Sequence, residues 1–388
     1  MKNNNRPSKP KVGLVMSGGG ARAAYQVGVL RAISELLPRD EGNPFPIICG
    51  TSAGAINAAV LAMNASHFRR GVRELMRVWK NFSAHHVYRS DPAGVLRNSA
   101  HWLLAALAGG GLGRQTPVSL LDNAPLAELL RTRLDFSAIQ AAIDAGDLNA
   151  VGVTCSGYAS GQAVTFFQGV PGLQPWQRAR RLGVASSIGP EHLLASSALP
   201  FIFPAVRINR EHFGDGSMRQ VAPISPALHL GADRLLIIGV GRQLERFPER
   251  IKTDAYPSLA QITGHCLNSI FLDSLEVDLE RLRRINRTLA LIPPQVIAQN
   301  EVSLRPVDFR QISPSRELEK IAAEYMHELP AAIRMLFYGA LKRSGSNLLS
   351  YLLFEKSYCR ALIYLGYEDT MRQRDDLMEF LGWCGPAE

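Results

Sequence analysis

A strand, a glycine-rich turn and a helix follow one another twice within the first 63 residues, and this repeat constrains the fold most. Val12–Met16 is a short apolar run, and Ala23–Leu37 carries apolar residues at helical spacing. Pro46–Cys49 is a second apolar run, before the small-residue helix Ala53–Met63. Because consecutive strand–helix units place parallel strands side by side, the sequence predicts the α/β class.

The middle of the chain continues with strands, and its last third becomes helical. Val151–Cys155 and Ala163–Phe167 are predicted strands joined by a Gly/Ser-rich turn, and Val206–Phe213 and Leu235–Val240 are further strand candidates. A helix is expected around Ala222–Leu230. The helical patterns of the last third are Ser269–Thr288, Pro314–Tyr338 and Gly345–Leu365.

These patterns divide the 388 residues into three parts. Residues 1–11 form a basic disordered tail with four basic and no acidic residues. Residues 12–245 form the α/β domain, and residues 255–388 form a mainly helical region that we expect to pack on it. Arg246–Arg250 reads as the linker between them.

Composition narrows the class of protein. With 46% hydrophobic and 20% charged residues, the chain is typical of a globular protein. Its five cysteines include no C-x-x-C pair, which argues against a zinc knuckle or a disulfide scaffold. No apolar run reaches the roughly 20 residues that a membrane span needs. We therefore expect a cytoplasmic protein, in a reducing compartment.

The net charge of +9 favours an acidic partner, such as nucleic acid, an anionic lipid surface or an acidic small molecule. The excess lies in the first part of the chain, because residues 228–388 hold 20 basic and 21 acidic residues. Arg281, Arg283, Arg284 and Arg287 follow acidic residues on one predicted helix, which indicates a salt-bridged solvent face.

Gly50–Gly54 is a G-x-S-x-G motif between a predicted strand and a predicted helix. A serine at this turn, here Ser52, projects its hydroxyl from the edge of the sheet, and the following helix favours developing negative charge. The alternative is a turn that only caps a buried helix.

Ser17–Arg22 is a second glycine-rich turn, also between a strand and a helix. Consecutive glycines expose backbone N–H groups to an anion or an oxyanion. Gly18–Ala23 also matches G-x-G-x-x-A, a dinucleotide-binding loop, but that site requires an acidic residue at the end of the second strand. The second strand instead runs into Gly50–Ser52.

The partner that would activate Ser52 is less clear from residues alone. Asp215 follows a strand candidate and stands between two glycines, as a strand-end base would, although a D-G pair is also a common turn. The histidines with no evident catalytic motif are His85, His86, His192 and His212.

Together the glycine triplet, the G-x-S-x-G and the strand-end D-G resemble the patatin-like phospholipases of the bacterial type. Ala195–Pro204 is similar to the family's segment before its catalytic aspartate, and Val221–Val240 to the helix and strand after it. The resemblance covers roughly residues 12–240. It implies a three-layer α/β/α core with a mainly parallel sheet, and a patatin-like catalytic domain over residues 12–245.

The resemblance also implies the roles of the site residues. Ser52 would be the nucleophile and Asp215 its base, in a Ser-Asp dyad that needs no metal and no cofactor. The oxyanion loop would be Gly18, Gly19, Gly20 and Ala21, with Arg22 nearby. The supporting glycines of the motifs would be Gly50, Gly54 and Gly216.

Two positions depart from the family pattern. Ala23 stands where the family has glycine, and an added methyl would matter if its backbone φ were positive. Ser217 replaces the glycine or alanine of D-G-G or D-G-A.

These residues predict a serine acyl-ester hydrolase for phospholipids or lysophospholipids, with no nucleic-acid partner. The alternatives are a weak or inactive lipid-binding protein on the same scaffold and a nucleotide-binding enzyme. The basic charge adds peripheral contact with an anionic membrane, on its inner face, to this hypothesis. Asn98–Gly113 is a candidate lid or a core helix.

Overall fold

The computed structural model describes residues 10–39, 41–92, 94–95, 97–100, 119–241, 274–293, 295–296, 304–336 and 346–383. Most of the basic tail, the Arg246–Arg250 linker and residues 101–113 of the lid candidate lie outside these ranges. Within them, no helix combines the length and the apolarity required to cross a bilayer.

A single mixed sheet organises the described residues, and its strands run in the order β10-β9-β1-β2-β3-β4-β6-β5. β8 pairs with β3 and with β7 away from this path. The pairs among β10, β9, β1, β2 and β3 are all parallel, whereas β3 pairs with β4 and β8 in the antiparallel sense. The strands are β1 (Val12–Met16), β2 (Ile47–Thr51), β3 (Ala150–Gly157), β4 (Ala163–Gly169), β5 (Trp176–Arg178), β6 (Arg181–Ala185), β7 (Val206–Ile208), β8 (Glu211–Asp215), β9 (Arg234–Ile238) and β10 (Asp308–Ile312).

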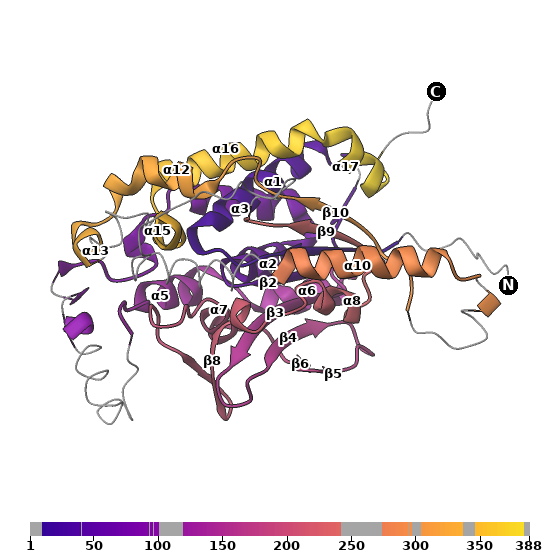
Figure 1. Cartoon of the computed structure of the whole chain (residues 1–388), viewed down its shortest axis with the longest axis horizontal. Helices are drawn as coiled ribbons and strands as arrows, with labels where there is room; N and C mark the ends of the chain where they lie inside the picture. Colours follow the sequence, from indigo (N-terminus) through magenta and orange to yellow (C-terminus); the bar gives the residue numbers. More distant parts are fainter. Residues whose placement is uncertain are drawn as a thin grey trace, which may run out of the picture.

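Helices cover both faces of the sheet, as a parallel sheet requires (Figure 1). The α-helices are α1 (Ala24–Leu36), α2 (Ala53–Met63), α3 (Phe68–Lys80), α5 (Ala124–Arg133), α6 (Ser137–Asp144), α7 (Pro190–Ser196), α8 (Ser225–His229), α10 (Ser274–Ala290), α12 (Leu318–Tyr325), α13 (Ala331–Leu336), α15 (Ser346–Leu352), α16 (Lys356–Arg372) and α17 (Arg374–Leu381). Short 3-10 turns include η1 (Gly20–Ala23), η3 (Ala84–His86), η5 (Gly216–Met218) and η7 (Met326–Glu328).

The side chains of each central strand alternate between two cores, which gives three layers. Leu14 and Leu236 face a core shared with α1, α2 and α16, whereas Val15 and Leu235 face the core of α8 and α10. This arrangement confirms the predicted α/β/α core with a mainly parallel sheet. α16 runs beside α1 on the outside of the first core (Figure 1).

Several predicted elements differ in detail. The strand predicted for Val206–Phe213 is a hairpin, β7 and β8, which turns at Asn209 with φ of 54°. The helix predicted for Pro314–Tyr338 is interrupted, because Leu329 is extended before Pro330. The helix predicted for Gly345–Leu365 is two helices, α15 and α16.

β10 was not predicted, because the last third of the chain reads as helical. It is a short edge strand whose side chains are mostly exposed or half-buried, and it extends the sheet beside β9. α10 packs next to it, and the guanidinium of Arg283 lies 5.2 Å from the ring centre of Phe309. Arg281 and Arg284 pair with Asp278 and Glu280, so the predicted salt-bridged face of this helix is confirmed.

Candidate active site

Ser52 stands at a strained turn where β2 ends and α2 begins. Its backbone has φ of 55° and ψ of −132°, a region that a residue with a side chain rarely adopts, and only 2% of its surface is exposed. The Ser52 N–H donates to the Ser196 hydroxyl at 2.9 Å, which in turn donates to the Thr154 carbonyl at 2.6 Å. The fold therefore holds this serine in a conformation that costs energy, as expected for a nucleophile at a strand-to-helix turn.

Asp215 lies beside Ser52 although 163 residues separate them in the sequence. β8 runs antiparallel to β3 and pairs Asp215 with Cys155, which brings the aspartate to the edge of the sheet where β2 ends. The carboxyl group is completely buried, and one oxygen, Oδ1, accepts from the Ser217 N–H at 2.9 Å. Ser52 and Asp215, predicted from separate motifs, are thus neighbours.

The charge state of Asp215 follows from this environment. Burial raises the pKa of the Asp215 carboxyl group to about 6, although the nearby Ser52 hydroxyl and the N–H and hydroxyl of Ser217 stabilise the carboxylate and oppose the rise. The second oxygen, Oδ2, has no hydrogen bond of ordinary geometry within the described residues. A carboxylate with this pKa is ionised near neutral pH and can accept a proton from Ser52.

The glycine loop after β1 packs against the same serine. A side chain at Gly18 would collide with the Ser217 hydroxyl and the Ser52 Cβ, and Gly20 has φ of 53°, which only glycine adopts easily. The N–H groups of Gly18 and Gly19 donate to no acceptor in the described part of the chain. Ala21 follows them in the 3-10 turn η1. This loop offers unpaired donors next to Ser52, the kind of arrangement that an oxyanion site requires.

Arg22 follows the glycine loop in η1, but its side chain makes its contacts with a distant part of the sequence. Its guanidinium is fully buried and donates to the Ser350 hydroxyl at 2.9 Å from Nε and 2.7 Å from Nη2. It also pairs with Glu319 at 2.8 Å and stacks on Tyr351. The Arg22 side chain thus contacts the C-terminal helices, while its main chain lies next to the glycine loop in η1.

The supporting glycines allow main chains to approach closely around the site. A Cβ at Gly54 would lie 2.6 Å from the Met16 carbonyl, so this glycine lets α2 start directly against the end of β1. Gly50 packs in the same way on the first turn of α2, and Gly216 packs on Thr154 of β3. Side chains at these positions would displace the strands that carry Ser52 and Asp215.

The two departures from the family pattern are accommodated. Ala23 is buried with φ of −65°, an ordinary helical value, so its methyl group causes no backbone strain there. Ser217 contributes both its N–H and its hydroxyl to Asp215. Neither position gives a structural reason for an inactive site.

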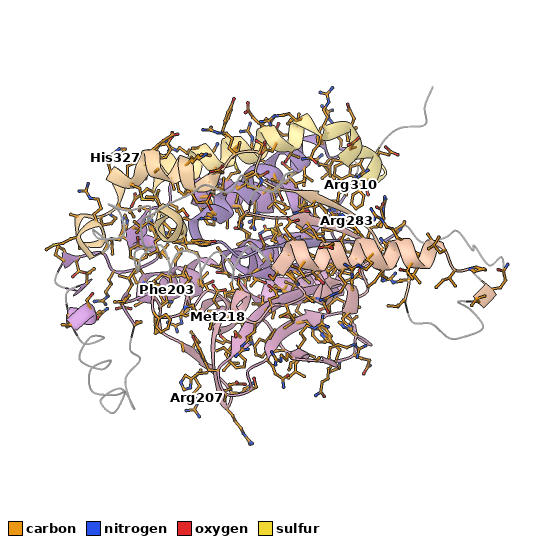
Figure 2. The ribbon with its side chains drawn as sticks, in the orientation of Figure 1. Phe203, Arg207, Met218, Arg283, Arg310 and His327 are labelled. Atoms are coloured by element: carbon orange, nitrogen blue, oxygen red, sulfur yellow. The ribbon has the colours of Figure 1, made fainter. Side chains whose placement is uncertain are left out.

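A cavity of about 550 Å³ opens from Ser52 between α2, α3 and α5. Ser52, Ile56 and Val60 lie at successive turns of one face of α2 and line it. Its other apolar lining residues include Leu75, Trp79, Leu126, Leu130, Phe203 and Phe354. Phe203, which Figure 2 labels, is one of these lining residues. An apolar space that opens from Ser52 suits a hydrocarbon chain.

Most of the residues that line this cavity were not predicted from the sequence. α3 was not predicted, although Phe68, Val72, Leu75 and Trp79 recur at helical spacing on its buried face. Phe354 lines the cavity from the C-terminal region, where the apolar spacing favours packing and offers a wall for an acyl chain only as the minor alternative. The missed signal was the strong polar and apolar separation of α3, which a helical projection would have exposed.

None of the four histidines considered as partners contacts Ser52 among the described residues. His192 accepts from the Gly189 N–H at the start of α7, and His212 is exposed on β8. His86 lines the cavity, but its Nδ1 accepts from the Ser83 N–H, and burial together with His85 lowers its pKa. Asp215 is therefore the titratable group in contact with the serine.

Comparison with known proteins agrees with this geometry. Residues 14–228, more than half of the chain, match the family model described as patatin-like phospholipase. The chain belongs to the patatin-like phospholipase family. Its matched part ends before α10 and contains Ser52, Asp215 and the glycine loop.

Several known phospholipases and lysophospholipases are similar to this chain over part of their own length. A cGAMP-activated phospholipase of Pseudomonas aeruginosa is 30% identical over 219 residues, which cover 56% of this chain and 55% of the relative. The chain thus spans about half the length of that relative. Lysophospholipase nte1 of Aspergillus terreus is 52% identical over 54 residues, 14% of this chain and 3% of that protein. A solved human GIVD cytosolic phospholipase A2 is 14% identical with a TM-score of 0.42, and covers 96% of this chain and 59% of its own.

Proposed function

We propose that the protein is a serine acyl-ester hydrolase that acts on phospholipids or lysophospholipids. The observation that carries this proposal is the junction of three features at one point. Ser52, strained and buried, lies against the Asp215 carboxyl group, beside the glycine loop, and at the end of a cavity with apolar walls. Each feature supplies one requirement of acyl transfer: nucleophile with base, oxyanion donors, and a place for the acyl chain.

The first chemical step would form an acyl-enzyme. Asp215 takes the proton of the Ser52 hydroxyl while the oxygen attacks the ester carbonyl carbon. The carbonyl oxygen gains the negative charge, which the N–H groups of the glycine loop stabilise. The tetrahedral intermediate then collapses, the bond to the alcohol oxygen breaks, and the proton on Asp215 passes to the departing alcohol.

The second step would return the enzyme to its starting state. A water molecule gives a proton to Asp215 and attacks the acyl carbon, through a second oxyanion held by the same loop. The bond to the Ser52 oxygen then breaks, and the serine recovers its proton from Asp215. The products are a carboxylic acid and an alcohol, so the balance needs only one water.

The cavity and the charge suggest how an amphiphilic substrate is held. The acyl chain would lie along Ile56 and Val60, while the headgroup remains outside with solvent. The net charge of +9 would attract the enzyme to anionic membranes. We expect binding to vesicles with anionic lipid to weaken between low and high salt in a sedimentation assay. Binding that ignores salt would leave this membrane contact unsupported.

The experiment that tests the hydrolase compares wild type with Ser52→Ala, Asp215→Asn and the control Ser160→Ala on a panel of lipids. Ser160 is an exposed serine in the β3–β4 turn, so its loss should leave fatty-acid release unchanged. The two site variants should lose about 10³-fold or more in kcat, because nucleophile and base act as one unit. Full activity in Ser52→Ala would rule out the dyad.

A fluorophosphonate probe separates this function from the lipid-binding alternative. A hydrolase should be labelled at Ser52, because the probe reacts with an activated serine hydroxyl. A protein that only binds lipid should bind vesicles or fatty acid while Ser52 stays unlabelled. The lipid-binding alternative was considered because Ala23 replaces a glycine of the family, and the backbone of Ala23 has an ordinary helical conformation.

A further inference from the structure

Arg22 is a charged side chain buried directly behind the glycine loop. It follows Gly18–Ala21 in η1, and none of its surface is exposed. A buried guanidinium is costly unless it is paired and its hydrogen bonds are made. The partners of Arg22 therefore show which part of the chain holds the glycine loop in place.

All the partners of Arg22 described above come from the C-terminal part of the chain. Glu319 on α12 accepts the ion pair at 2.8 Å, and Ser350 on α15 accepts two hydrogen bonds. The ring of Tyr351, also on α15, lies 4.1 Å from the guanidinium carbon. We call these four residues the Arg22 anchor. Three of them lie outside residues 14–228, which match the family model.

The main chain of the loop contacts the same helix. A side chain at Gly20 would collide with the carbonyl group of Tyr351, so loop and helix touch without an intervening side chain. Just after α15, Phe354 lines the cavity that opens from Ser52. One C-terminal segment thus contacts both the loop with the oxyanion donors and the wall of the cavity.

We propose that α12 and α15 of the C-terminal part position the glycine loop for catalysis through the Arg22 anchor. The inference rests on the proposed hydrolase function, but it adds a part of the chain that the family match does not include. Arg22 is a positioning residue here, because its guanidinium acts through the loop and contacts no reacting atom.

Physical chemistry explains why such an anchor would matter for the rate. Oxyanion donors stabilise the transition state only when they are fixed within a few tenths of an ångström of the developing charge. The loop contains three consecutive glycines, which lose more backbone entropy on ordering than other residues. A buried bidentate arginine next to these glycines restricts them from one side, while Ser52 and Ser217 restrict Gly18 from the other.

The test measures kcat and KM separately for Glu319→Gln, Ser350→Ala, Arg22→Lys and the control Glu324→Gln. Glu324 lies on the same helix, α12, but its pair with Arg316 is exposed and 4.0 Å long. We expect kcat to fall about 10-fold for Glu319→Gln and about 100-fold for Arg22→Lys, since a misplacement of about 1 Å can cost 10²-fold. Lysine cannot reproduce the bidentate contact, so it should not rescue the rate.

KM should change little in these variants, because the acyl chain is held by the walls of the cavity. Near-ultraviolet circular dichroism and thermal unfolding identify any variant that fails to fold. If Arg22→Lys does not fold, the milder Ser350→Ala variant, which removes only one hydroxyl group, still tests the anchor. A merely structural role would lower the melting temperature and leave kcat of the folded protein unchanged. That outcome, or a control that loses as much as Glu319→Gln, would overturn the proposal.

The failure of this inference differs from the failure of the proposed function. Wild-type protein that releases no fatty acid and takes up no fluorophosphonate probe would refute the hydrolase itself. Active wild type with equally active Glu319→Gln, Ser350→Ala and Arg22→Lys variants would refute only the anchor. Probe labelling adds a second measure, because the anchor variants should react with the probe more slowly at Ser52.

Discussion

Asp215 combines two properties that oppose each other, full burial and the need to carry charge. Burial raises the pKa of its carboxyl group to about 6, and donors from Ser52 and Ser217 limit the rise. Without those donors the carboxyl group would stay protonated to still higher pH and could act as a base only above that pH. The residues around Asp215 therefore set the lower end of the pH range in which the proposed dyad can work.

The pH profile of kcat/KM tests this assignment. Because the pKa is raised, the protonated and inactive form of Asp215 persists up to about pH 6. Activity should be full well above pH 6, fall to half near it, and decrease tenfold per pH unit below it. In Ser217→Gly one stabilising donor is lost, so the half-point should move to higher pH.

Titration of fatty-acid release between pH 4.5 and pH 9 checks both curves (roughly one point per half unit suffices to place a single pKa). Ser160→Ala, on an exposed turn, should keep the wild-type profile. A Ser217→Gly profile identical to wild type would show that the hydroxyl of Ser217 does not stabilise the ionised aspartate.

At the scale of residues, the position of a side chain could be predicted from the sequence where a motif fixes the backbone. Ser52 and the glycines needed only local patterns, because a strand, a tight turn and a helix place them. Asp215 depended on the family resemblance, since only the long-range pairing of β8 with β3 brings it to Ser52. The partners of Arg22 could not be predicted, because Glu319 and Ser350 lie about 300 residues away in the sequence.

At the scale of elements, α2 begins directly after Ser52, the proposed nucleophile, and supplies one wall of the cavity. Ser52 caps its first turn, and Ile56 and Val60 follow on the same face. At 1.5 Å per residue, Val60 lies about 12 Å along the helix from Ser52. The length of an acyl chain that fits beside this helix thus depends on the side chains one and two turns after the serine.

Enlarging Val60 should shorten the preferred acyl chain. In Val60→Trp the indole would fill the cavity two turns from Ser52, so kcat/KM for long acyl chains should fall about 10- to 100-fold while short chains retain their rate. Hydrolysis of nitrophenyl esters of increasing chain length measures the effect. Val277→Trp, an exposed position on α10 across the sheet, is the matched control. Equal losses for short and long esters would contradict this placement of the chain.

Elements differ in how far the sequence could predict them. β1 and α2 were predicted with their observed bounds, because each is an uninterrupted pattern between clear turns. β10 is a polar edge strand that only its pairing with β9 defines, so no local pattern distinguishes it. The helices that shape the cavity, α2, α3 and α5, come from separate stretches of the sequence, and their apolar faces meet only in the folded chain.

At the scale of the whole molecule, the C-terminal part completes the core that the first part begins. β10 adds to the same sheet as β1, and α16 covers α1 (Figure 1). The two helices cross where a Cβ at Gly28 would meet the Ile363 carbonyl and a Cβ at Gly366 would meet that of Tyr25. We propose that residues 12–245 and 255–388 unfold as one cooperative unit, because neither part buries its apolar surface alone.

Gly366→Ala tests this cooperativity at the helix crossing. The added methyl group must displace the main chain of α1, so the free energy of unfolding should fall by about 1–3 kcal/mol, as overpacking in a core typically costs. Gly42→Ala, in an exposed loop with nothing within 4 Å, should change stability by less than about 1 kcal/mol. Urea unfolding followed by circular dichroism and by the fluorescence of the four tryptophans, among them Trp79 beside the cavity, measures both variants. We expect one shared transition that shifts in Gly366→Ala, because the clash at α16 would then also destabilise the region around the cavity. Two separated transitions, with only the second shifted, would show that the C-terminal helices fold apart from the sheet.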